Sequence, residues 1–132
     1  MFLNKSLHIE RTEKTPEIDL NPEGIITIRG RGLVLTGSYT YDCALNWIDE
    51  YISYPAEITY VNLSFEYLNS FTTALIVTML KTLVQVDRQS KKLVVNWYYE
   101  QDDEDIVERG EFLSSSLNIP FIFIKTKSPG IV

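Results

Sequence analysis

The pattern of apolar and polar positions predicts a chain in which strands and helices alternate. "SLHIERT", residues 6–12, alternates apolar with polar side chains and predicts a short strand. "KTPEIDLNPEG", residues 14–24, contains two prolines and predicts a loop, or an irregular edge strand, that ends in a turn. "GIITIRGRG", residues 24–32, predicts a second strand. "GLVLT", residues 32–36, either extends this strand or forms the loop after it.

Three segments have apolar residues at helical spacing. They are "TYDCALNWIDEYIS" at 40–53, "SFTTALIVTMLKTLVQVDRQ" at 70–89 and "DDEDIVERGEFLSSSLN" at 102–118. Strand-like runs lie between and after them: "EITYVNLSFEYL" at 57–68, "KKLVVNWYYE" at 91–100 and "PFIFIKT" at 120–126. Strict alternation along the first of these runs places Tyr67 on the same face as Val61, Leu63 and Phe65.

The predicted order is therefore β-β-α-β-α-β-α-β. Strands that alternate with helices indicate an α/β fold, with a mixed, mainly parallel sheet covered by helices and right-handed crossovers. The first two strands are expected to form an antiparallel hairpin at one edge of the sheet. A length of 132 residues fits a single domain, here expected to span 1–126, with a flexible tail at 127–132.

Composition narrows the range of partners. Apolar residues make up 45% and charged residues 23% of the chain, which is typical of globular proteins. The formal net charge of -6 argues against nonspecific binding to nucleic acid, which requires a basic surface. No apolar run has the length of a membrane span, and the N-terminal residues lack the apolar core of a signal peptide. With Cys43 as its one cysteine, the chain is expected in the cytoplasm.

Residues for catalysis or cofactor binding are sparse. Nothing in the sequence connects His8, the one histidine, with Cys43 or Ser70, so no nucleophile–base pair is expected. The "GRG" of Gly30–Gly32 lacks the context of a phosphate-binding loop, and its glycines are expected to permit an unusual backbone turn. We therefore expect neither an enzyme nor a bound cofactor.

The acidic run "EQDDEDIVERGE", residues 100–111, allows three interpretations. Its carboxylates would suit calcium or magnesium, although the spacing is not that of an EF-hand. They would also stabilise the positive end of the helix that begins there. Finally, they would form a negative docking patch for a basic partner. Just before this run, Tyr98 points away from Trp97 and Tyr99, so it either packs in the core or serves as an exposed aromatic anchor for a partner.

The junction "YLNSFTTALIVTML", residues 67–80, combines a helix start with a surplus of hydroxyl groups. Asn69 or Ser70 would cap the helix by accepting a hydrogen bond from a free backbone N–H group. A helix N-terminus also favours anions, so a phosphoryl group added to Ser70 would be stabilised there. Capping and phosphorylation are compatible at this position.

Four segments resemble the SiaC-type regulatory phosphoproteins, a bacterial family with a fold like STAS anti-sigma-factor antagonists. They are "TP" at 15–16, "GR" at 30–31 with "NWIDEY" at 46–51, "YLNS" at 67–70 and "VNWYYEQDDEDIVERGE" at 95–111. "YLNS" is similar to the family's phosphoacceptor motif, and the likeness extends from Leu7 to Phe123. Two positions depart from the family pattern: 32–36 is apolar, and Phe71 stands where a small hydroxyl residue is usual.

The resemblance implies a non-catalytic protein that exchanges partners according to its phosphorylation state. A kinase of the SiaB type would phosphorylate it, a PP2C-like phosphatase would reverse the modification, and a diguanylate cyclase would be a target of the unphosphorylated form. By motif position the phosphoacceptor is Ser70, with Thr72 and Thr73 as alternatives. The residues expected to bind partners are Arg31, Tyr67, Asn69, Phe71, Thr73 and Tyr98. The alternative function is a STAS-like module that binds a small molecule or lipid, for which the apolar residues 32–36 would suit a pocket mouth.

Overall fold

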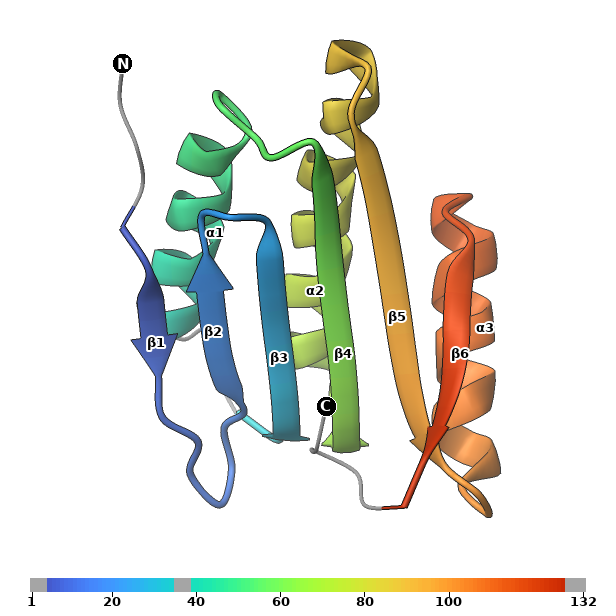
Figure 1. The fold of residues 1–132 in the computed structure, drawn as a ribbon. Helices are drawn as coiled ribbons and strands as arrows, with labels where there is room; N and C mark the ends of the chain where they lie inside the picture. The colour runs from blue at the N-terminus through green and yellow to red at the C-terminus, as the bar shows by residue number, and fades with distance from the viewer. Residues whose placement is uncertain (1–4, 35–38, 128–132) are drawn as a thin grey trace.

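A six-stranded sheet with the strand order β1-β2-β3-β4-β5-β6 forms the centre of the fold (Figure 1). The computed structural model describes residues 5–34 and 39–127. The strands are β1 (Leu7–Ile9), β2 (Glu17–Asn21), β3 (Ile25–Gly32), β4 (Ile58–Leu68), β5 (Lys92–Glu100) and β6 (Phe121–Thr126). The helices are α1 (Tyr39–Tyr51), α2 (Ser70–Leu83), the 3-10 helix η1 (Val84–Gln89) and α3 (Glu104–Leu117). Strands β1 to β3 are antiparallel, and β3 to β6 are parallel.

The predicted order lacks one strand, β2. The sequence predicted a loop or an irregular edge strand there, but Glu17–Asn21 pairs with β1 on one side and β3 on the other. Its side chains alternate as a strand requires, with Ile18 and Leu20 fully buried. Pro16 and Pro22 flank the strand without interrupting it, so neither removes a hydrogen bond from the ladder. The two prolines therefore mark the boundaries of a regular strand.

All three long helices cover the same face of the sheet (Figure 1). The crossovers β3-α1-β4, β4-α2-β5 and β5-α3-β6 each move one strand further in the same direction. Because such crossovers keep one hand, their helices must lie on one side. The sequence predicted a sheet covered by helices, and the structure restricts that cover to a single face. No helix among the described residues covers the opposite face, which we call the open face.

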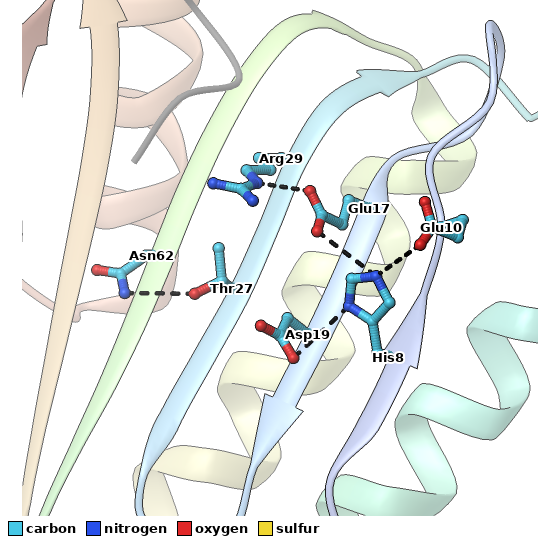
Figure 2. A network of polar contacts seen from close by, with 7 residues as sticks. All are labelled: His8, Glu10, Glu17, Asp19, Thr27, Arg29 and Asn62. Carbon is cyan, nitrogen blue, oxygen red and sulfur yellow. Dashed lines mark hydrogen bonds and ion pairs between the residues drawn. The ribbon is translucent and has the colours of Figure 1, made fainter.

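Polar side chains from β1 to β4 face one another across neighbouring strands on the open face (Figure 2). The Arg29 Nε–H donates to Glu17 Oε1 over 2.6 Å, from positions directly paired in the β2–β3 ladder. His8 lies 3.7 Å from the second oxygen of Glu17. Further along, Asn62 Nδ2 lies 3.5 Å from Thr27 Oγ1, and Asn96 donates to Asn62 over 2.9 Å. These contacts satisfy polar groups that no helix covers.

The core lies between the sheet and the helices, and Trp97 on β5 is its largest fully buried side chain. Its indole N–H donates to the carbonyl of Ile106 in α3 over 3.0 Å, and its ring stacks on Phe121. Helix α3 approaches this ring at Gly110. A Cβ atom at that position would lie 2.6 Å from Trp97 Nε1 and 2.8 Å from Phe123. The absence of a side chain at Gly110 therefore sets how closely α3 packs on the sheet.

A β-bulge near the end of β3 and β4 changes which side chains reach the open face. Gly30 pairs with Phe65, but the next residue, Arg31, pairs with Tyr67, so β4 has one extra residue there. Gly30 has a φ of 117°, which glycine adopts without strain. As predicted, Gly30 thus permits an unusual backbone conformation. The bulge also reverses the alternation, so Tyr67 is exposed and Leu68 is buried, and the predicted placement of Tyr67 with Leu63 is wrong.

Two predictions concern the ends of elements. The helix predicted at 70–89 is α-helical only to Leu83, tightens into η1 and ends at Ser90, which has a φ of 61°. Of the predicted tail at 127–132, residues 128–132 lie outside the described residues.

Within the described ranges, no helix is both long enough and apolar enough to cross a membrane.

Gly110→Ala tests the close approach of α3. Alanine in a helix interior ordinarily stabilises relative to glycine by about 1 kcal/mol. Here the Cβ would collide with Trp97, so we expect the free energy of unfolding to fall by about 1–3 kcal/mol. Urea denaturation followed by Trp fluorescence measures it. Ser116→Ala, at an exposed position of the same helix, is the control and should change stability by less than about 0.5 kcal/mol. A stabilised Gly110→Ala variant would contradict the packing described.

Glu17→Gln tests the ion pair of the open face. The hydrogen bond from Arg29 lowers the pKa of Glu17 below its ordinary value of 4.5. Because the folded-state pKa is the lower one, the contribution is complete above about pH 4.5 and is lost as the pH falls through the folded-state pKa. We expect the variant to be about 1 kcal/mol less stable at pH 7, with a difference that shrinks below pH 4.5. Denaturation at a series of pH values measures this, and a difference independent of pH would refute it.

Candidate functional site

One end of the sheet is the end at which the parallel strands finish. There, the carboxyl ends of β3 and β4 meet the N-terminal ends of α1 and α2 (Figure 1). Asn69 joins them. Its Oδ1 accepts a hydrogen bond from the Thr72 backbone N–H over 3.1 Å, so Asn69 is the N-cap of α2. Its Nδ2 donates to the carbonyl of Val34, in the segment after β3. Of the two caps that the sequence allowed, the structure therefore uses Asn69, and Ser70 is the first residue of the helix.

The three hydroxyl residues at this junction have different surroundings. Ser70 is exposed, and within the described part of the chain its hydroxyl has no hydrogen bond. Thr73 is half-buried, and its hydroxyl donates to the carbonyl of Asn69 over 2.9 Å. Thr72 is fully buried, and its hydroxyl lies 2.7 Å from that of Tyr41. Ser70 is thus the hydroxyl that an enzyme can reach without opening the fold, whereas Thr72 is inaccessible.

Thr72 instead contributes to the structure of the junction. A Cβ on Gly32 would lie 2.6 Å from the Thr72 methyl group, so β3 can pass this close to α2 only with glycine. Gly32 was expected, with Gly30, to permit an unusual turn, but it has an ordinary backbone and serves close packing instead. Burial raises the pKa of Tyr41, and the hydrogen bond with Thr72 partly offsets this effect. The Tyr41–Thr72 pair fixes α1 against α2.

Arg31 and Tyr67 flank the junction on the open face. The guanidinium carbon of Arg31 lies 5.7 Å from the centre of the Tyr67 ring, and its Nε lies 3.5 Å from Glu66. The bulge is what brings Arg31 and Tyr67 opposite each other. Tyr98 is also on this face, but it pairs with Ser64, further back along β4. The predicted partner-binding residues therefore form two groups. Arg31, Tyr67 and Tyr98 lie on the open face, and Asn69, Phe71 and Thr73 lie at the start of α2.

Exposed aromatic side chains lie at the carboxyl end of β4, at the starts of α1 and α2, and on α3. Phe71 on α2 is 44% exposed, and Tyr67 is 57% exposed. Two more were not singled out from the sequence: Tyr39 at the start of α1 and Phe112 on α3. Phe112 lines a groove of about 250 Å³ beside the junction, together with Leu68, Thr73, Asp105, Glu108, Arg109 and Leu113. Exposed aromatic residues of this kind are typical anchors of protein interfaces.

Arg109, which the sequence gave no reason to single out, reaches this junction from α3. Its Nη1 donates to the carbonyl of Leu68 over 2.7 Å, and its Nε donates to Asp105 over 3.1 Å. The sequence shows only the i,i+4 spacing of Asp105 and Arg109, which indicates an ordinary surface pair. The contact with Leu68 depends on α3 packing beside α2, and no local pattern reveals it.

The acidic run, residues 100–111, includes the cap and the first two turns of α3. Asp103 is its N-cap, accepting a hydrogen bond from the Ile106 N–H over 3.1 Å, and Glu104 and Asp105 lie in the first turn. This agrees with the helix-start interpretation. A cleft of about 850 Å³ here is lined by charged and polar residues: Glu100, Gln101, Asp102, Asp103, Lys125, Thr126 and Lys127. Among the described residues, no cluster of carboxylate, His or Cys side chains is arranged to hold a metal ion.

The three residues that would suggest catalysis lie apart. His8 is on the open face, where its contacts are Glu10, Glu17 and Asp19 (Figure 2). Cys43 and Ser70 belong to helices that cover the other face. The pocket mouth of the ligand-binding alternative falls partly outside the described residues, because these end at Val34 and resume at Tyr39.

Solved structures from Pseudomonas aeruginosa have the same fold. A chain in the crystal structure of the diguanylate cyclase SiaD in complex with its activator SiaC superimposes with a TM-score of 0.81 at 20% identity, covering 91% of this chain and 99% of that one. Apo-SiaC superimposes with a TM-score of 0.79 at 20% identity, covering 92% of this chain and 99% of that one. No curated protein sequence matches the chain. The model of the SiaC family of regulatory phosphoproteins matches residues 9–126, and the chain therefore belongs to the SiaC family.

Proposed function

We propose that this chain is a non-catalytic bacterial regulatory phosphoprotein that acts in the cytoplasm and exchanges protein partners when Ser70 is phosphorylated. One observation carries the proposal. Ser70 is exposed and its hydroxyl has no hydrogen bond in the described structure, while Asn69 caps the helix and the hydroxyls of Thr72 and Thr73 are already bonded. The cap does not depend on the hydroxyl that is modified. The helix can therefore stay intact in both states.

The modification transfers a phosphoryl group from ATP. The Ser70 oxygen bonds to the γ-phosphorus as the bond to the ADP oxygen breaks, and the hydroxyl proton is released. The product carries about -1.5 to -2 charge at pH 7 and three acceptor oxygens. A phosphatase would reverse it by transferring the phosphoryl group to water. The family's description as regulatory phosphoproteins supports a reversible modification. We assign its first step to a kinase of the SiaB type and its second to a PP2C-like enzyme.

The surface around Ser70 supports a role in partner exchange. We define the aromatic docking surface as Tyr39, Tyr67, Phe71 and Phe112, all of them exposed. Phe71 follows Ser70 directly and Tyr67 precedes it by three residues, so a partner that buries these two rings would also cover Ser70. A dianion placed there would have to be desolvated by such a partner, which is costly unless the partner supplies a cation. Phosphorylation would therefore release one partner and admit another.

A diguanylate cyclase is the partner that we propose for the unphosphorylated form. The support is that a structure with this fold belongs to a complex of the cyclase SiaD with its activator SiaC. In this chain Phe71 is part of the aromatic docking surface, so its ring would contribute directly to the contact. The open-face residues Arg31 and Tyr98 would then extend the contact beyond the junction.

Incubation with a kinase of the SiaB type and ATP tests the phosphoacceptor. We expect one phosphoryl group per chain, mapped to Ser70 by mass spectrometry, and no modification of Ser70→Ala. Thr73→Ala, which removes the neighbouring half-buried hydroxyl, is the matched control and should still be modified. Label that persists in Ser70→Ala would disprove the assignment, and an unmodified wild-type protein would argue against the phosphoprotein function itself.

Phe71→Ala tests the aromatic docking surface. We expect the affinity for the diguanylate cyclase to fall by about tenfold or more, because an aromatic anchor is lost. Tyr54→Ala is the control, since Tyr54 is 56% exposed but lies beyond the C-terminal end of α1, at the opposite edge of the sheet. Interferometry with immobilised cyclase measures both variants. Equal losses in the two variants, or no loss in either, would count against this surface.

A further inference from the structure

We propose that Arg109 reads the phosphorylation state of Ser70. In the unmodified protein its guanidinium is bonded to the Leu68 carbonyl and to Asp105. When Ser70 carries a phosphoryl group, the guanidinium leaves Asp105 and pairs with the phosphate. This inference rests on the proposed function, because it requires a phosphoryl group on Ser70.

The position of the guanidinium carries the inference. Leu68 immediately precedes the cap residue Asn69, and Ser70 follows it, so the bond from Arg109 Nη1 to the Leu68 carbonyl holds a cation two residues from the acceptor. Ser70 and Thr73 are three residues apart in α2 and therefore share a side of the helix. Thr73 lines the same groove as Arg109. Ser70 and Arg109 thus belong to one small region of the surface.

The present partners of Arg109 can be exchanged. Its side chain is 45% exposed and that of Asp105 is 74% exposed, and an exposed i,i+4 pair contributes only about 0.3–0.5 kcal/mol. A phosphate dianion carries more charge and offers several oxygens to the planar fork of N–H groups. A guanidinium has five N–H donors, and the described bonds to Leu68 and Asp105 use two of them. Arg109 can therefore bind a phosphate without giving up the Leu68 carbonyl.

The charges of the groove single out Arg109. Asp105 and Glu108 line it as anions and would repel a phosphate, and Arg109 is the cation among its lining residues. Arg31 and Arg11 also lie near the end of β3. Arg31 is held on the open face by the Tyr67 ring and Glu66, and the Arg11 guanidinium lies beside Gly30. The phosphate would thus be neutralised from α3. Movement of Arg109 would leave Asp105 unpaired and alter the groove beside Phe112, which belongs to the aromatic docking surface.

The experiment places phosphoserine at position 70 during translation, so that it does not depend on any kinase. Phosphorus NMR then follows the second ionisation of the phosphate as the pH is varied, in the parent protein and in Arg109→Gln. A paired guanidinium favours the dianion, so we expect the pKa to be lower in the parent, by about 0.5–1 unit. Arg88→Gln, an exposed arginine in η1 beyond the far end of α2, is the matched control and should titrate like the parent.

Two further variants make the result decisive. Arg109→Lys keeps the charge and one donor for Leu68 but loses the fork, and we expect it to titrate between the parent and Arg109→Gln. It also guards against poor folding of Arg109→Gln, which circular dichroism checks. The same pKa in the parent and both Arg109 variants would overturn the proposal, as would a shift that appears in Arg31→Gln instead. Failure of the kinase to modify Ser70 would contradict only the proposed function. It would leave the role of Arg109 unaffected, because phosphoserine is introduced here directly.

Discussion

The constraint on which this structure depends is the common hand of its three β-α-β crossovers. Because strands β3 to β6 follow one another in a single direction, each connecting helix must lie on the same face of the sheet. Each strand-to-helix junction then lies at the same end of the sheet, where the parallel strands finish. One face becomes the core, the opposite face is left to water, and the N-terminal ends of α1, α2 and α3 are gathered near the carboxyl ends of the strands.

The β4–α2 junction shows how a helix cap and an exposed hydroxyl can coexist. Asn69 supplies both the cap of α2 and the tie to the segment after β3, while Thr72 and Tyr41 fill the buried side. These bonds leave Ser70 as a surface residue whose hydroxyl makes no hydrogen bond within the described residues. A phosphoryl group at that position would change the surface without dismantling the helix. A switch built in this way would act through charge and docking and would leave the fold in place.

The open face follows from the same constraint, and its polar groups are satisfied by pairing with one another across strands. Without helices to cover it, the sheet places paired polar groups there, as in Glu17–Arg29 (Figure 2) and in the Asn62–Asn96 pair. Such pairs satisfy one another across adjacent strands and contribute modestly because water competes for them. The bulge, in which β4 has one extra residue opposite Gly30, interrupts this regular pattern close to the junction and turns Tyr67 outward, beside Arg31. The surface near Ser70 thereby acquires aromatic and cationic groups together.

The sequence by itself determined the three helices and every strand except β2, because periodicity reports which side of each segment is buried. It also determined the acidic cap of α3 and the β4–α2 junction with its candidate hydroxyls, since cap residues act on backbone groups a few positions away. Only the tertiary structure decided the rest. The strand β2 was obscured by its flanking prolines, and the outward turn of Tyr67 depends on one extra residue opposite Gly30. Arg109 meets Leu68 because α3 packs beside the end of β4, and contacts between residues so distant in sequence leave no local pattern.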